Sequence, residues 1–257
     1  MMTQQITMAV KKEVKWLLPF YLFTFLPSIM GVKKGVKWLL PFYLFTFLPS
    51  TTLAQTVKLN SDGRDTTYVN NIVKRSQKIV DGLGITADST ALNVRNIIAN
   101  RYFLLNDIHE ECAQSKRYAK DSLDSWLRNA AIEQAEQRRD ALLYKHHFEL
   151  EAALSLYITP EQIEGVKDGM TFGVVPKTYQ AHLEMIPSLT DFEKQQILAW
   201  LKEAREFAMD AENSNKKHNW FGKYKGRINN WLSARGYDLV REREGWYQRI
   251  GMQQPAK

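Results

Sequence analysis

Hydrophobic residues recur along most of this chain with the spacing of an α-helix. Between residues 69 and 239, apolar positions return every three or four residues, which places them on one face of a helix that turns about 100° per residue. The alternation of apolar and polar residues that is typical of a half-buried strand is not sustained anywhere, and only Thr56–Leu59 has the composition of a short strand. The pattern therefore predicts an all-α fold.

Breaks in the pattern predict three helices in the first half of this region. Gly82 stops the first helix, and Asp88 or Ser89 is expected to cap the second, because a short polar side chain accepts a hydrogen bond from the first free backbone N–H groups. The third helix is expected to extend from near Asp121 to near Tyr157. Its middle is strongly polar, so we expect that part to face solvent or to be broken.

Capping boxes mark two helix starts in the second half. Thr159 is followed by Pro160 and, three residues after the cap, by Gln162; Thr190 is followed three residues later by Glu193. In this arrangement the threonine hydroxyl and the Gln or Glu side chain each bond a backbone N–H that the helix leaves unpaired. Both positions therefore predict the first turn of a helix.

A last clear helix is predicted to begin at Asn213 or Ser214 and to stop at Gly236, since glycine readily adopts the left-handed conformation after a helix. About six helices result. The pattern thus predicts a single helical domain, a bundle covering residues 55–257, after a signal segment at residues 1–54.

The predicted signal segment is duplicated. The sequence VKWLLPFYLFTFLPS occurs at Val14–Ser28 and again, unchanged, at Val36–Ser50. Each copy is a basic stretch followed by an apolar run too short to span a membrane, which needs roughly 20 apolar residues. Only the second copy is followed by small residues, with Thr52 and Ala54 in the pattern of a cleavage site. We therefore expect an exported protein, periplasmic or extracellular, with no stable membrane anchor after cleavage.

Removal of this segment changes the charge of the protein. The full chain has 35 basic and 28 acidic residues and a net charge of +7. The leader contains six lysines and one glutamate, so the remainder has 29 basic and 27 acidic residues and a net charge of +2. The positive charge is therefore no argument for a nucleic-acid partner, and none is predicted.

The predicted last helix contains the residues of most interest. Its apolar positions fall within one third of the helix circumference; they are Trp220, Phe221, Tyr224, Ile228, Trp231 and Leu232. Lys223, Arg227 and Asn230 lie beside Trp220 and Trp231 at the edge of this stripe. The stripe has the width of a buried face, which is one interpretation. The other is a sugar-binding surface, in which aromatic rings cover the C–H face of a sugar while arginine and amide groups bond its hydroxyls or carboxylate.

A second unusual segment is Lys167–Tyr179, where glycines and a proline predict a shaped loop between helices. The loop is either a tight connection packed into the core or one wall of a ligand cleft. In the second interpretation, Lys167, Asp168 and Tyr179 face the last helix across the cleft.

Long sequence phrases in this half support a family resemblance. The segments ITPEQIEGVKDGMTFGVVPKTY (residues 158–179) and PSLTDFEKQQILAWLKEAREFAMDAENSNKKHNWFGKYKGRINNWLSARGYDL (residues 187–239) resemble the domain of unknown function 3826 family. The most specific phrases are KDGMT, EAREFAMDA and KYKGRINNWL. The resemblance implies an exported bacterial protein, an all-helical domain and sugar binding, but no reaction and no catalytic residues.

Motifs of common catalytic chemistry are missing from the sequence. It contains no HExxH, CxxC or GxSxG, and Cys112 is the only cysteine, so an internal disulfide is excluded. His109 and His146 each stand beside another residue able to bind metal, but neighbouring residues on a helix point in different directions. We therefore predict no metal site and no cofactor, and we assign no catalytic residue.

Together these features predict an exported carbohydrate-binding or accessory protein of bacterial polysaccharide utilisation, whose ligand is a carbohydrate, acidic sugars included. One alternative is a helical glycan-active enzyme, a lyase or hydrolase, which needs a deep cleft with a tyrosine, histidine or carboxylate beside Arg227. Another is a helical periplasmic chaperone or scaffold, which needs an exposed apolar concave face. Glycan binding by the purified protein distinguishes the first class from the last.

The signal segment makes a direct prediction about processing. Because Thr52 and Ala54 follow the second apolar run, the exported protein is expected to begin at Gln55. Mass spectrometry of the N-terminal peptide of exported material checks this; an intact Met1 or Met30 would contradict it.

Overall fold

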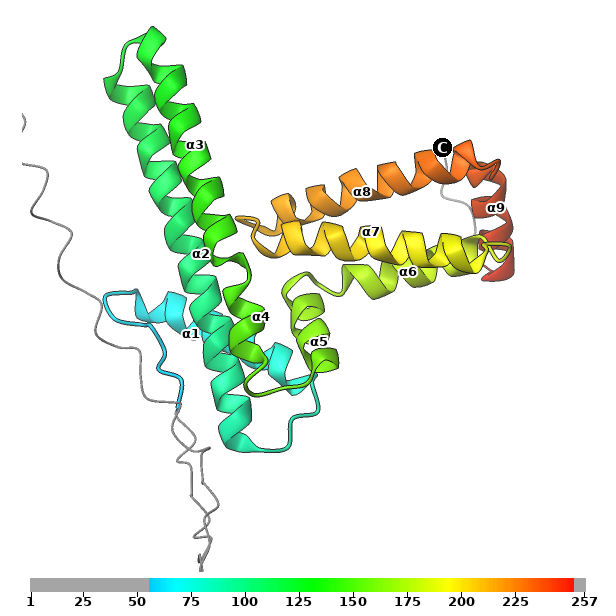
Figure 1. The fold of residues 1–257 in the computed structure, drawn as a ribbon, viewed down its shortest axis with the longest axis horizontal. Helices are drawn as coiled ribbons and strands as arrows, with labels where there is room; N and C mark the ends of the chain where they lie inside the picture. The colour runs from blue at the N-terminus through cyan, green and yellow to red at the C-terminus, as the bar shows by residue number, and fades with distance from the viewer. Residues whose placement is uncertain (1–55, 252–257) are drawn as a thin grey trace, which may run out of the picture. The chain divides into compact units, whose positions relative to one another are not determined.

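The computed structural model describes residues 56–251, so the predicted signal segment lies outside the described residues. Helices dominate this part of the chain and no strand occurs in it, which confirms the all-α prediction (Figure 1). The helices are α1 (Thr66–Asp81), α2 (Asp88–Ser122), α3 (Ser125–His147), α4 (Glu149–Leu154), α5 (Pro160–Met170), α6 (Val174–Met185), α7 (Asp191–Met209), α8 (Ser214–Ala234) and α9 (Leu239–Arg249). None of the helices in residues 56–251 is long and apolar enough to cross a membrane.

The described helices exceed the predicted number of about six for three reasons, one of which is that α9 follows the helix that was expected to be the last. The long third helix of the prediction is interrupted at Phe148, which separates α3 from the short α4. The predicted loop at Lys167–Tyr179 is in fact largely helical, so that prediction was wrong. Only Thr171, Phe172 and Gly173 connect α5 to α6, and both Phe172 and Gly173 have positive φ angles, 62° and 64°, which change the direction of the chain within three residues.

Glycine in α5 has a packing role that the sequence does not reveal. Glycine often ends a helix, but α5 continues past Gly169 through Met170. A Cβ atom at position 169 would lie 2.8 Å from Cγ2 of Ile79 on α1, closer than van der Waals contact allows. The absence of a side chain therefore lets α1 and α5 approach each other, and the glycine marks a helix contact rather than a helix end.

The caps agree with the sequence in the second half and differ at one place in the first. Thr159 and Thr190 form complete capping boxes with Gln162 and Glu193. The side chain of Asn213 accepts a hydrogen bond from the backbone N–H of Lys216 at the start of α8. Helix α2 begins where predicted, but its N-cap position is Ala87, which makes no side-chain cap, so neither Asp88 nor Ser89 is the cap.

The segment before α1 is extended but is not a strand. Instead of pairing with another backbone, it is held by side chains of α2. The backbone N–H of Val57 donates to Oδ1 of Asn93 at 2.8 Å, and Nδ2 of Asn96 donates to the carbonyl of Val57 at 2.7 Å. The two asparagine side chains thus make the hydrogen bonds that a neighbouring strand would otherwise make with Val57.

Two clusters of buried side chains hold the helices together. The first joins α1, α2, α4 and α5; its fully buried members include Val94, Ile98, Leu154 and Val166. The second joins α6, α7 and α8, and its fully buried members include Ile197, Leu201, Ile228 and Leu232. Burial of each such side chain contributes about 1.5–3 kcal/mol relative to exposure.

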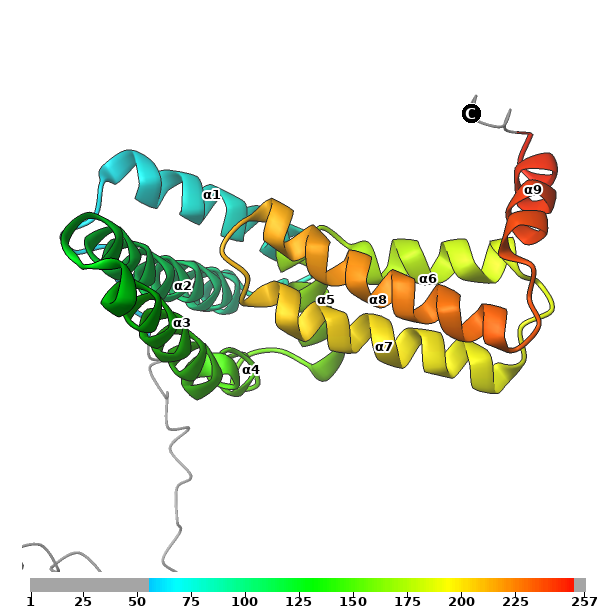
Figure 2. The ribbon, with the colours of Figure 1, turned by 90° about the horizontal axis from the view of Figure 1, so that it is seen from above.

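Helices α2 and α3 form a long antiparallel hairpin, and α7 and α8 form a second antiparallel pair (Figures 1 and 2). Helix α5 contacts α1 on one side and α7 on the other, so it links the two clusters. Met209, the last residue of α7, is buried in the first cluster although its helix belongs mainly to the second. The end of α7 and the start of α8 therefore pack against the helices of the first cluster.

Replacement of two helical glycines by alanine is expected to have opposite effects. Gly226→Ala in α8 meets nothing within 4 Å and should raise the free energy of unfolding by about 1 kcal/mol, the difference in helix propensity. Gly169→Ala gains the same propensity but forces its Cβ against Ile79, so it should lower stability by about 1–3 kcal/mol. Thermal or urea unfolding measures both changes. An increase in stability for Gly169→Ala would contradict the close contact of α1 with α5.

Candidate functional site

A cleft of about 730 Å³ opens between the hairpin of α2 and α3 and the junction of α7 with α8. Its apolar lining consists mainly of aromatic side chains, and its floor is polar. The lining includes Tyr144, His147 and Phe148 from the end of α3, Glu206, Phe207 and Asp210 from the end of α7, and Trp220 from α8.

Aromatic rings line the cleft on two sides, one formed by α7 and α8 and the other by the end of α3. On the α7–α8 side, the rings of Phe207 and Trp220 are stacked with their centroids 4.6 Å apart and an angle of 17° between their planes. On the α3 side, Tyr144 and Phe148 meet edge to face at 6.3 Å. Phe207 is 47% exposed, Tyr144 75% and Phe148 64%. Single exposed aromatic side chains are common, but several gathered around one concave surface are typical of a binding site.

Asp210 is the centre of the polar floor. Nη2 of the buried Arg101 on α2 donates to one carboxylate oxygen at 2.5 Å, and Nδ1 of His147 donates to the other at 2.7 Å. The main-chain carbonyl of Asp210 also lies 2.8 Å from Nε2 of His109. This residue, immediately after α7, thus contacts three side chains of α2 and α3.

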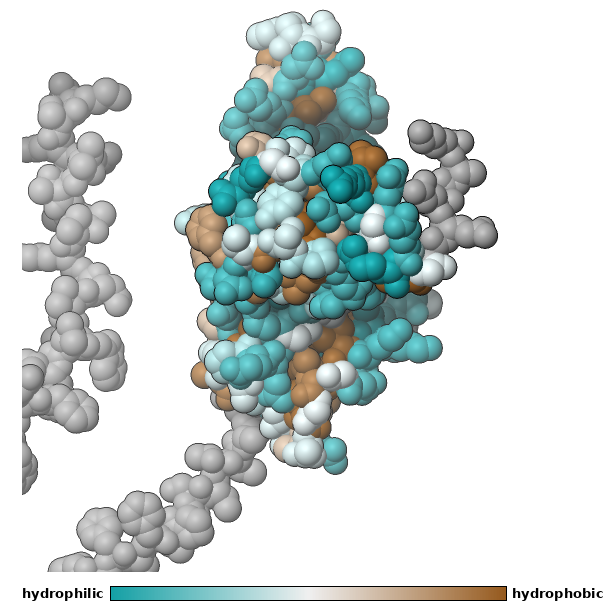
Figure 3. Space-filling model, turned by 90° about the vertical axis from the view of Figure 1, so that its right-hand side faces the viewer, coloured by the Kyte–Doolittle hydropathy of each residue, from teal (hydrophilic) through white to brown (hydrophobic). Residues whose placement is uncertain are grey.

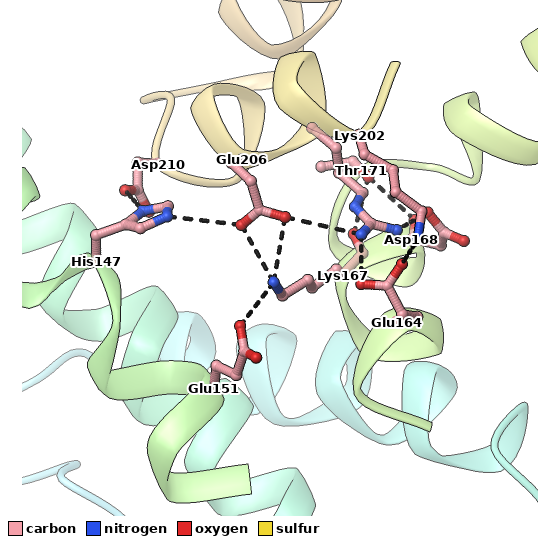
Figure 4. A network of polar contacts seen from close by, with 10 residues as sticks. His147, Glu151, Glu164, Lys167, Asp168, Thr171, Lys202, Glu206 and Asp210 are labelled. Carbon is pink, nitrogen blue, oxygen red and sulfur yellow. Dashed lines mark hydrogen bonds and ion pairs between the residues drawn. The ribbon is translucent and has the colours of Figure 1, made fainter. Parts of the chain in front are cut away.

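His147 is held in its charged form by two carboxylates (Figure 4). Hydrogen bonds from the ring to Asp210 and to Glu206, the latter at 3.5 Å, outweigh the effect of burial and raise the pKa of His147 to about 9. At neutral pH both ring nitrogens therefore carry hydrogen. An imidazolium in this position orients carboxylates but is not available as a general base.

The ionic network continues behind the cleft to α5 (Figure 4). Nζ of Lys167 lies 2.9 Å from Oε2 of Glu151 and 3.2 Å from Oε1 of Glu206. Burial acts to lower the pKa of Lys167, but its hydrogen bonds to these carboxylates raise it overall. Lys167 therefore stays charged and holds the carboxylate of Glu206 in position.

A second ionic group fixes α5 to α7. The fully buried Arg205 donates to Asp168 and to Glu164, each at 2.7 Å. Although burial favours the neutral acid, hydrogen bonds from Arg205 and Lys202 lower the pKa of Glu164 to about 2. Because the guanidinium is buried while both carboxylates are partly exposed, this group joins α5 to α7 at the edge of the core.

The structure places the predicted residues of α8 on the exposed flank beside α7. Nζ of Lys223 lies 5.1 Å from the ring centroid of Trp220. The guanidinium of Arg227 lies 4.5 Å from the ring of Trp200 on α7. Trp231 meets Trp200 edge to face at 5.1 Å. Trp220 and Trp231 are both partly exposed, and Asn230 is exposed, so this flank is a surface that also contacts the second core cluster.

Arg227 has one acidic neighbour. Its Nη1 lies 3.4 Å from a carboxylate oxygen of Glu203, a long contact between two half-exposed side chains. Exposed pairs of this kind contribute little to stability. The guanidinium thus keeps most of its hydrogen-bonding capacity on the surface of α8.

The other three predicted residues do not face α8 across a cleft. Lys167 is 8% exposed and directed to Glu151 and Glu206, while Asp168 is bonded to Arg205. Tyr179, on α6, packs against the second core cluster. The expected cleft wall is absent here because the segment that should have formed a loop is helical and its polar side chains are used between α5 and α7.

Most residues of the cleft were not found from the sequence. The pairs Tyr144 and Phe148, and Glu206 and Asp210, have the four-residue spacing that puts two side chains on one helix face. That spacing can be read from the sequence. No local pattern, however, shows that the face with Tyr144 and the face with Glu206 lie close together. Across residues 56–251, the structure contains no group of three or more His, Cys, Asp and Glu side chains arranged to hold a metal ion.

Comparison with known proteins places the chain in a family. The family model described as "Protein of unknown function (DUF3826)" matches residues 69–251, so the chain belongs to that family. The match includes nearly all of α1 and every later helix, and hence all residues of the cleft. A search of curated proteins found no match.

The charge state of His147 predicts a dependence of stability on pH. Its pKa in the folded protein, about 9, is above its ordinary value of 6.5. Its contribution is therefore complete below about pH 6.5 and is lost as the pH rises through 9. Urea unfolding between pH 6 and 9.5, compared with His147→Gln, should show that the stability advantage of the natural protein declines over this range. A constant difference would mean that His147 is not held as the imidazolium.

Proposed function

We propose that this protein is an exported carbohydrate-binding protein, an accessory to bacterial polysaccharide utilisation, and that the cleft between α3 and the α7–α8 junction is its binding site. The observation that carries the proposal is the pair of exposed aromatic surfaces, Phe207 with Trp220 and Tyr144 with Phe148, around a polar floor. Export is supported by the duplicated apolar leader of the sequence.

The chemistry of the cleft suits a sugar. A pyranose ring has flat patches of C–H groups, which pack on aromatic rings, and hydroxyls around its edge, which need both donors and acceptors. The floor supplies acceptors at Glu206 and Asp210, whose positions are fixed by Arg101, His147 and Lys167. Fixed polar groups lose little freedom on binding, which favours affinity.

The aromatic surface continues from the cleft along α8. Eleven residues separate Trp220 from Trp231, which corresponds to about 16 Å along the helix axis at 1.5 Å per residue. Lys223, Arg227 and Asn230 lie between the two tryptophans and provide hydrogen-bond donors. The surface is therefore longer than one sugar ring, and it suits an oligosaccharide whose end occupies the cleft.

The alternatives receive less support from the geometry. An enzyme acting through His147 needs that residue as a base, but two carboxylates hold it protonated. Arg227 contacts Trp200 and does not line the cleft. A chaperone needs a continuous apolar concave face, whereas charged residues are interspersed throughout the cleft. The face drawn in Figure 3 is likewise mostly hydrophilic, with separate apolar patches.

Binding to a glycan array, followed by calorimetry with the best oligosaccharide, tests the proposal. Trp220→Ala and Phe207→Ala each remove one of the two stacked rings on the α7–α8 side of the cleft and are expected to weaken binding about 10-fold or more, from the loss of roughly 1.5–3 kcal/mol of apolar contact. Arg227→Ala and Asn230→Ala should reduce affinity for longer oligosaccharides more than for short ones.

Trp126→Ala is the matched control. Trp126 is 76% exposed near the start of α3 and does not line the cleft, so its removal should leave affinity unchanged. Equal affinities of the natural protein, Trp220→Ala and Phe207→Ala for a bound glycan, with folding confirmed by circular dichroism, would exclude the cleft as the binding site.

A further inference from the structure

A second concave surface lies among α1, α2, the end of α5 and the start of α8. It is a broad groove of about 1720 Å³, and residues from much of α1 form one side of it. Its lining differs from that of the cleft in charge. Six basic residues line the groove, against two acidic residues, Asp81 and Glu212. The basic residues are Lys74, Arg75, Lys78, Arg95, Lys177 and Lys217.

These six basic side chains have no carboxylate partner within residues 56–251. Basic residues elsewhere in this part of the chain are often paired, including Lys116, Arg139 and His147 in the cleft. The positive charge of the groove is therefore not compensated by the described chain. Concave surfaces with one sign of charge concentrate ligands of the opposite sign.

Lys217 carries its positive charge in a buried position, which is unfavourable in free energy. It is 7% exposed, and its ammonium group donates to the carbonyls of Met209 at 3.1 Å and Met170 at 3.3 Å. An ammonium has three N–H donors, and no acceptor for the third occurs in the part of the chain that the structure describes. Burial lowers the pKa of Lys217 to about 8; Asp210 acts in the opposite direction, while Arg75 and Arg101 add to the lowering.

Phe172, in the connection from α5 to α6, is a second unusual feature of the groove. Among residues 56–251 it is the only residue other than glycine with a positive φ angle, 62°. This conformation brings Cβ close to the carbonyl oxygen and is unfavourable, so it persists where the surroundings enforce it. Nζ of Lys177 donates to the carbonyl of Phe172, and the Phe172 ring, 47% exposed, stacks on His218 at 5.4 Å. A strained backbone thus presents an aromatic ring to the groove.

We propose that this groove is a separate binding site for an acidic oligosaccharide, with carboxylate or sulfate groups on the basic side chains and a sugar face near Phe172. The basic residues are distributed along α1 and across to α8, which suits an extended chain of charges better than one phosphate. Exposed amides of Asn70, Asn71 and Asn106 also line the groove, and amides bond hydroxyls as donors and as acceptors. This site is separate from the floor of the cleft, where Lys116, Arg139 and His147 are paired with carboxylates.

Calorimetry with three probes tests this proposal, with protein expressed from the full coding sequence in a secreting host. The probes are an oligogalacturonate, a sulfated oligosaccharide and a single-stranded oligonucleotide of similar charge. At least one of the two acidic oligosaccharides should bind, more weakly as salt rises from 50 to 200 mM. Tighter binding of the oligonucleotide than of both saccharides would assign the groove to nucleic acid and overturn the proposal.

Charge variants then locate the site. Arg75→Gln and Lys78→Gln should each weaken binding of the acidic oligosaccharide about 10-fold, as expected for a lost charge-assisted hydrogen bond. Lys120→Gln removes the same charge from an exposed position near the end of α2, outside the groove, and should change affinity little. Wild-type affinity in Arg75→Gln and Lys78→Gln would overturn the site. Trp220→Ala should leave this binding intact, which separates the groove from the cleft.

Phe172→Gly separates a ligand contact from a structural role. Glycine tolerates the positive φ angle, so the variant should be at least as stable as the natural protein in thermal unfolding. Loss of the ring should nevertheless weaken binding about 3- to 10-fold. Unchanged affinity in a stable Phe172→Gly variant would remove the ring from the site.

Discussion

The position of Asp210 determines how the two groups of helices meet. Its carboxylate binds Arg101 on α2 and His147 on α3, and its carbonyl contacts His109. The turn from α7 to α8 is thereby attached to the α2–α3 hairpin by charged hydrogen bonds in a mostly buried place. Charges that are removed from water require well-placed partners, so this arrangement tolerates few alternatives. The buried side chain of Met209, next to Asp210, adds an apolar contact at the same place.

The same junction produces both concave surfaces. The cleft opens where α3 meets the end of α7, and the groove lies where α1 and α5 meet the start of α8. Asp210 serves the cleft directly, while Lys217, one turn into α8, lines the groove and lies within the field of Asp210. One short segment between α7 and α8 therefore contributes to two surfaces of opposite character.

Charge compensation distinguishes these surfaces. At the cleft, His147 pairs with Glu206 and Asp210, and Lys167 pairs with Glu206 from outside the cleft lining. In the groove, the basic residues are left without carboxylates from the described chain. The ligands that we propose for the two surfaces would together correspond to a polysaccharide with neutral and acidic parts. The two surfaces differ because carboxylates lie next to the basic side chains of one and not of the other. The net charge of the chain does not decide this difference.

The sequence by itself determined the all-α class, most of the helices and several of their ends. Thr159 and Thr190 act within four residues of chain, and the periodicity that put Phe221 and Ile228 on one helix face is also local, so both could be recognised without a structure. The tertiary structure decided the rest. His147 and Asp210 are 63 residues apart, and Lys167 and Glu206 are 39 apart, so no local pattern pairs them. The same holds for Gly169, whose small size matters only because Ile79 lies against it, and for the polar side chains of α5, which were expected in a cleft and serve instead to join two helices. Local rules fix the helices, whereas the sites depend on contacts between residues that only the packing of those helices brings together.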